Sequence, residues 1–115
     1  MGSIMLPYRA PMESSEVPSY DLLQVQYVAR KGWVQTSTRV DLDVMREGHD
    51  PDDVRDCFLQ LEAADFHKTV PDDRGSGDML DVYLPSYCGE QMYIKFKLTD
   101  DNRIYVLSFK RSTSR

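Results

Sequence analysis

Hydrophobic and polar residues alternate along residues 91–111, QMYIKFKLTDDNRIYVLSFKR. Two β-rich runs flank a polar cluster at residues 99–102, which predicts a β-hairpin. Because successive side chains of a strand point to opposite faces, the hairpin has one apolar face, which we expect to pack against helices. That predicted apolar face consists of Ile94, Phe96, Leu98, Tyr105, Leu107 and Phe109.

The opposite face of this hairpin collects polar side chains, namely Tyr93, Lys95, Ser108 and Lys110. A phenol, a hydroxyl and several fixed cations on one face suit a bound polyanion. The alternative is that the lysines keep the sheet in solution and protect its edge from pairing with other chains. The pattern alone leaves both interpretations open.

Helical periodicity and capping signals predict three helices upstream of the strands: residues 20–31, 38–47 and 50–62. The first begins after the N-cap Ser19 and ends at Gly32, and the second is stopped by Gly48. The apolar stripe expected on the first helix is Leu22, Leu23, Tyr27 and Val28. The apolar positions expected on the second are Val40, Leu42, Val44 and Met45, and those on the third are Val54, Cys57, Phe58 and Leu61.

After residue 66 the hydrophobic period changes to two, which predicts strands at 67–70 and 79–84 joined by the flexible turn 71–78. Residues 33–37 are predicted to be a short extended link, and residues 85–90 link the last of these strands to the final hairpin. Helices first and an antiparallel meander second give an α+β fold with the helices on one sheet face. We expect a single domain at residues 19–111, a flexible proline-containing leader at 1–18 and a short tail at 112–115.

Composition sets the broad class of protein. A chain of 115 residues with 41% hydrophobic and 29% charged residues is typical of one small globular domain. The two cysteines, Cys57 and Cys88, lie far apart without a CxxC motif, which favours a reducing cytoplasm over a disulfide scaffold or zinc site. We therefore expect a cytoplasmic protein without membrane spans.

The net charge of −5 is unevenly distributed. Acidic residues dominate residues 41–62, whereas basic residues dominate from Tyr93 onward. A ligand responds to the field near it, because charges more than about 8 Å away are largely screened at physiological salt. The acidic total therefore does not exclude a polyanion at the final hairpin.

The segment Asp50-Pro51-Asp52-Asp53 has the composition of a helix start: a cap, a proline and acids in the first turn. These acids lack the remaining spacing of a calcium loop, so we interpret them as capping and solvated groups. We expect no metal and no cofactor.

Four short fragments occur in order along the predicted strands: DFHK (65–68), DVY (81–83), YIK (93–95) and LSFK (107–110). This order resembles the MqsR toxin family, bacterial mRNA interferases with a RelE-like fold. The resemblance covers about residues 20–110. It implies a type II toxin that cleaves mRNA without a metal and arrests growth. It also implies neutralisation by a zinc-binding MqsA-type antitoxin in a toxin–antitoxin hetero-oligomer.

The resemblance also implies site residues. Lys68, Tyr93 and Lys110 match the catalytic Lys, Tyr and Lys expected in the family. Substrate-binding roles follow for four further positions: His67, Leu80, Tyr83 and Lys95. His67 stands where the family often has tyrosine, and it is either an acid or base beside the site or a structural histidine. Strict alternation favours the structural role, because His67 and Lys68 would point to opposite faces.

Leu80 departs most from the family, which often has a functional glutamine there. Leu80 is a core residue if Val82 and Leu84 face the helices. If the strand bulges or twists, Leu80 lines the cleft as an apolar patch. We adopt the second interpretation, which predicts residual nuclease activity with relaxed base preference. The competing function is a catalytically weakened module that binds RNA or protein through the Lys/Tyr face.

Overall fold

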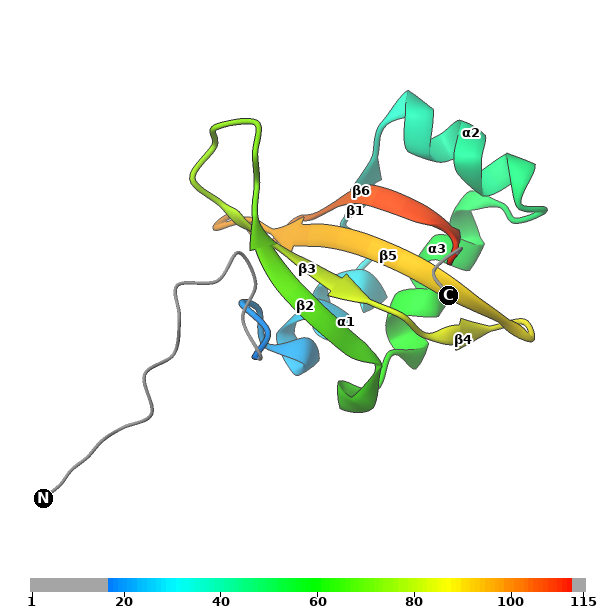
Figure 1. The fold of residues 1–115 in the computed structure, drawn as a ribbon, viewed down its shortest axis with the longest axis horizontal. Helices are drawn as coiled ribbons and strands as arrows, with labels where there is room; N and C mark the ends of the chain where they lie inside the picture. The colour runs from blue at the N-terminus through cyan, green and yellow to red at the C-terminus, as the bar shows by residue number, and fades with distance from the viewer. Residues whose placement is uncertain (1–16, 113–115) are drawn as a thin grey trace, which may run out of the picture.

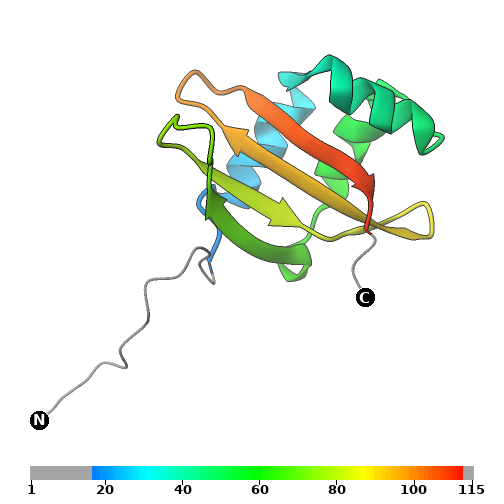
Figure 2. The same cartoon turned by 45° about the horizontal axis from the view of Figure 1, so that its top comes forward.

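Helices cover one face of a twisted sheet and leave its other face open (Figures 1 and 2). This computed structural model describes residues 17–112. The helices are α1 (Leu22–Arg30), α2 (Thr38–Arg46), α3 (Pro51–Gln60) and the short 3-10 helix η1 (Ala63–Asp65). The strands are β1 (Val34–Thr36), β2 (Phe66–Pro71), β3 (Met79–Tyr83), β4 (Ser86–Tyr87), β5 (Glu90–Leu98) and β6 (Ile104–Arg111). Apart from 17, 18 and 112, the predicted leader and tail lie outside the described residues.

The strand order β1-β6-β5-β3-β2 makes β5 central, with β4 paired to its start. Neighbouring strands run antiparallel except β1, which runs parallel to β6. The α+β architecture is therefore as predicted and compatible with a RelE-like fold, but the sheet is mixed, not purely antiparallel. The difference arises because residues 33–37, predicted to be a link, add a strand at the sheet edge.

The core lies between the helices and the sheet. Its helical part comes from all three helices: Val25, Val28 and Ala29, then Val40 and Val44, then Val54, Cys57 and Phe58. Its sheet part is mainly Tyr83, Met92, Ile94, Phe96, Ile104, Val106 and Phe109. In the described part of the chain, no helix has the length and apolar character needed to cross a bilayer.

Helix α3 matches its prediction. The Asp50 side chain caps it by accepting a hydrogen bond from the Asp53 N–H. The Asp53 side chain in turn accepts a hydrogen bond from the Asp50 N–H. Cys57 is buried as predicted, and burial raises the pKa of its thiol to about 12. This cysteine is therefore a core residue that stays protonated.

Helix α1 differs from its prediction at its start and along its apolar stripe. Asp21 is the N-cap, and Ser19 lies upstream of it. Leu23 and Tyr27 are exposed, because the stripe that faces the sheet runs through Val25, Val28 and Ala29. On α2, Leu42 and Met45 are likewise exposed, whereas Val40 and Val44 are buried.

Two β-bulges interrupt the alternation of the strands. In β6 the pairs Lys95↔Ser108 and Phe96↔Val106 leave Leu107 as an extra residue. The predicted apolar face of β6 was consequently wrong at its start: Ile104 and Val106 face the core, and Tyr105 does not. In β2, His67 is the extra residue between Phe66, which pairs with Tyr83, and Lys68, which pairs with Val82.

Candidate functional site

The open face of the sheet carries most of the residues that the sequence singled out. One row of side chains crosses it, because Lys68 pairs with Val82, Val82 with Lys95, and Lys95 with Ser108. Adjacent strands are about 4.8 Å apart, so the backbones of Lys68 and Lys95 are separated by roughly 10 Å. Flexible lysine side chains at this separation can reach one phosphodiester group.

Tyr93 and Lys110 form the next row and are cross-strand partners, as the hairpin pattern predicts. The Lys110 ammonium lies 5.7 Å from the centre of the Tyr93 ring, within cation–π range. Burial raises the pKa of Tyr93, so its phenol stays protonated at neutral pH. The pair therefore presents a neutral hydroxyl beside a fixed positive charge.

The lysines of this face have no acidic partner in the part of the chain that the structure describes. Among residues 17–112, no acidic side chain pairs with Lys68, Lys95 or Lys110. His67 is exposed at the β2 bulge, next to Lys68. The alternation that favoured a structural role for His67 does not hold there, since the bulge places Phe66 and Lys68 on opposite faces.

A cleft of about 720 Å³ continues this face toward the β1 edge. Its floor includes Leu80, Lys95 and Lys97, and its walls come from the β1–α2 junction and the β2–β3 loop. Leu80 lines the cleft on the open face, but the residue is buried, at only 3% exposed, so our interpretation of Leu80 as a cleft residue stays a prediction.

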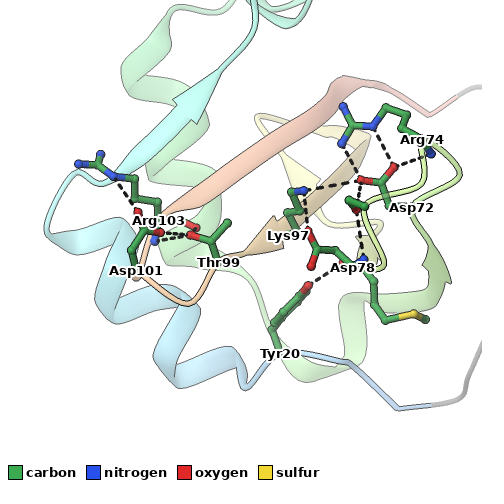
Figure 3. A network of polar contacts seen from close by, with 10 residues as sticks. Tyr20, Asp72, Arg74, Asp78, Lys97, Thr99, Asp101 and Arg103 are labelled. Carbon is green, nitrogen blue, oxygen red and sulfur yellow. Dashed lines mark hydrogen bonds and ion pairs between the residues drawn. The ribbon is translucent and has the colours of Figure 1, made fainter.

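The β2–β3 loop is held in place by the carboxylate of Asp72, a buried residue (Figure 3). Arg74 donates two hydrogen bonds from its side chain to Asp72, at 2.8 and 2.7 Å, and the Ser76 hydroxyl donates a third at 2.9 Å. The Lys97 ammonium lies 2.8 Å from Asp78 and 3.6 Å from Asp72. Hydrogen bonds from Arg74 hold the pKa of Asp72 well below its usual range. This network ties the loop to β5.

Tyr83 does not join the other predicted site residues. It lies on the helix-facing side of β3, stacked on Phe96 with ring centres 5.9 Å apart. Burial raises the pKa of its phenol to about 12. The structure thus brings Lys68, Leu80, Tyr93, Lys95 and Lys110 to one face and leaves Tyr83 on the other.

Several cleft residues were missed by the sequence analysis: Gln35, Arg39, Asp72, Arg74, Lys97 and Tyr105. The available signal was the alternation of residues 34–36. On a short strand, this alternation places Gln35 on the face opposite to that of Val34 and Thr36. The remaining residues come together only through tertiary structure.

The described residues thus form an α+β domain with several lysines on the open face of its sheet. The family model described as "Motility quorum-sensing regulator, toxin of MqsA" matches residues 17–111. The chain therefore belongs to the MqsR toxin family, whose members are toxins of toxin–antitoxin systems with an MqsA antitoxin as partner. A search of curated proteins finds no match to this chain.

Proposed function

We propose that this toxin is a metal-independent endoribonuclease that cleaves mRNA in the cytoplasm and arrests growth. The observation that carries the proposal is the group of lysines near Tyr93 on the open face, which have no acidic partner among residues 17–112: Lys68, Lys95 and Lys110. RNA is a polyanion, and its cleavage builds further negative charge on the phosphorus oxygens. Preorganised cations and hydrogen-bond donors stabilise such charge in the transition state.

The proposed reaction uses the 2′-hydroxyl of the RNA itself. The 2′-oxygen attacks the adjacent phosphorus and loses its proton, the bond from phosphorus to the 5′-oxygen breaks, and that oxygen gains a proton. The products are a 2′,3′-cyclic phosphate and a free 5′-hydroxyl. Tyr93 donates a hydrogen bond to a non-bridging oxygen, and Lys110 compensates the developing charge. We assign the proton transfer to Lys68, which lies on β2 with His67 beside it.

Growth and cleavage assays with matched variants test the proposal. The unaltered chain is expected to stop growth when expressed without its antitoxin and to yield cyclic-phosphate ends on purified RNA. Lys68→Ala, Tyr93→Phe and Lys110→Ala are each expected to relieve the arrest. Lys31→Ala, at the exposed C-cap of α1, is expected to retain it. Unchanged toxicity in all three open-face variants would remove the proposed site.

The second candidate is a binding module without catalysis, and Leu80 is the observation that favours it. An aliphatic side chain at the cleft floor supplies no hydrogen bond to a base or phosphate. On this alternative the purified chain binds RNA but leaves it intact, and expression without the antitoxin is tolerated.

A further inference from the structure

One row of open-face positions crosses the floor of the cleft. Gln35 of β1 pairs with Tyr105 of β6, and Tyr105 pairs with Lys97 of β5. Leu80 adjoins the same row on β3, since the neighbouring residues Asp81 and Phe96 are paired. All four residues line the cleft. An amide, an aromatic ring, a cation and an aliphatic side chain therefore follow one another across four strands.

Gln35 and Tyr105 have the chemistry that recognises a nucleobase. Aromatic rings stack on unpaired bases, and side-chain amides hydrogen-bond to base edges. Gln35 is exposed, and its amide has no hydrogen-bond partner among residues 17–112. Tyr105 is partly exposed beside it. The free amide and the ring are thus available to a ligand on the cleft floor.

Arg39 gives the cleft a positioned cation. Its guanidinium donates a hydrogen bond of 3.2 Å to the Leu107 carbonyl, which belongs to the bulge residue of β6. This contact draws the Arg39 side chain toward the sheet, where it lines the cleft. Lys97 and Arg74, by contrast, are already paired with Asp72 and Asp78 and hold the opposite wall in place.

Lys95 connects the cleft to the proposed catalytic residues. It lines the cleft, and it lies two residues from Tyr93 on the same face of β5. Two residues of a strand span roughly 7 Å, which is comparable to the spacing of successive phosphates in single-stranded RNA. An RNA strand with one phosphate held at Tyr93 and Lys110 would therefore place the next nucleotide in the cleft.

We infer that the cleft is a nucleobase subsite that sets the sequence preference of the toxin. Tyr105 stacks on the base next to the scissile bond, and Gln35 reads its edge. Arg39 binds the attached phosphate. The inference rests on the proposed nuclease function, because a cleavage preference requires cleavage. RNA binding to the cleft, however, is measurable without cleavage. Gln35 takes the base-reading role that Leu80 cannot fill.

Binding to a non-cleavable RNA tests the cleft separately from catalysis. The probes are fluorescent single-stranded oligonucleotides with 2′-O-methyl groups, which lack the attacking hydroxyl, and each contains one varied base in a uniform background. Fluorescence anisotropy at fixed salt measures the Kd of the full chain and of Gln35→Leu, Tyr105→Leu and Tyr105→Phe. Gln91→Leu is the matched control, because Gln91 is an exposed strand glutamine outside the cleft.

The expected result is a Kd about ten- to a hundredfold higher for Gln35→Leu and Tyr105→Leu, with little change for Tyr105→Phe and Gln91→Leu. Gln35→Leu is also expected to abolish the difference between oligonucleotides that vary in one base. Thermal melts verify that each variant is folded. Equal affinities for Gln35→Leu, Gln91→Leu and the unaltered chain would overturn the inference, as would the absence of any RNA binding.

Cleavage mapping on RNA of random sequence separates the two proposals. If the unaltered chain cleaves RNA and Gln35→Leu cleaves the same sites at the same rate, the subsite is wrong and the nuclease stands. If the chain binds the probes with the expected variant pattern but cleaves no RNA, the nuclease is wrong and the subsite stands. Loss of preference at one nucleotide in Gln35→Leu, with retained total cleavage, supports both.

Discussion

The ammonium of Lys110 lies 5.7 Å from the centre of the Tyr93 ring on the open face, and a second pair of the same kind lies on the helical side. There the Lys31 ammonium is 5.3 Å from the centre of the Tyr27 ring. The two pairs share their local chemistry, but only the first lies among the unneutralised lysines of the sheet. The second is therefore an internal standard for the effect of removing a cation from a tyrosine ring.

Replacing Lys110 by methionine is expected to lower the cleavage rate about a hundredfold or more, because the transition state loses one cation, worth roughly 2.7–4 kcal/mol. Stability is expected to change little, since Lys110 is exposed. Single-turnover cleavage of a labelled RNA measures the effect. Lys31→Met should leave the rate unaltered, and an equal rate loss in both variants would contradict the site.

Replacing Leu80 by glutamine is expected to raise cleavage and sharpen sequence preference. Leu80 lines the cleft floor, and an amide there can contact a base at a gain of roughly 1–3 kcal/mol of discrimination. Cleavage mapping and thermal melts on one preparation measure both effects. A lower melting temperature without added activity would show that the amide is merely buried without a partner, at a cost of about 1–3 kcal/mol.

Replacing Asp81 by leucine is expected to destabilise the protein by about 1–3 kcal/mol or more. The fully buried Asp81 carboxylate accepts hydrogen bonds from the backbone N–H groups of Ser19, at 2.9 Å, and Tyr20, at 3.0 Å. Without the carboxylate, both donors before α1 lose their partner. Urea denaturation measures the difference in the free energy of unfolding. Asp81→Asn should lose less stability, because one acceptor oxygen remains. Asp100→Asn, at an exposed position, serves as control.

Replacing Asp72 by asparagine is expected to make stability less dependent on pH in acid. The folded state holds the pKa of Asp72 below its unfolded value of about 4. Its contribution is therefore complete above pH 4 and is lost as the pH falls through the lower, folded value. Urea denaturation between pH 7 and 2 should show a constant difference between the two proteins down to about pH 4, narrowing below it. A constant difference throughout would contradict this role.

An MqsA-type antitoxin is expected to bind with nanomolar affinity or better, by extending the sheet and by contacting helices. The outer edges of β1 and β2 have no neighbouring strand among the described residues and can accept an added strand. The acidic residues of 41–62 complement basic groups on such a partner. Titration calorimetry with the product of the neighbouring gene measures the affinity, and absence of both heat and co-elution would reject this partner.

Local signals predicted much of the fold, because they act over a few residues. The Asp50–Asp53 capping box marked the start of α3, and the turn at 99–102 marked the hairpin that pairs β5 with β6. Both features depend on hydrogen bonds or pairing between neighbours in sequence. The predicted lysine and tyrosine face therefore formed as the alternation of β5 indicated.

The failures depend on distant parts of the chain. Residues 34–36 become a strand only because β6 lies beside them, and they then present Gln35 to the cleft. Tyr83 was assigned to the substrate from a fragment of sequence, although its pairing with Ile94 turns it toward the helices. The one-residue bulge at Leu107 also reverses the faces that strict alternation assigned to residues 104–106.

Each of the two bulges adds one residue to its strand, His67 to β2 and Leu107 to β6. If Leu107 were deleted, Val106 and Ser108 would be consecutive residues. Val106 would still face the core opposite Phe96, Ser108 would still face the open side opposite Lys95, and the other pairs between β5 and β6 would also be kept. The same holds for His67 between Phe66 and Lys68. Neither extra residue is needed for the hydrophobic pattern of its strand. Leu107 instead supplies the carbonyl that Arg39 contacts, and His67 supplies an imidazole beside Lys68, so each insertion adds a group to the open face.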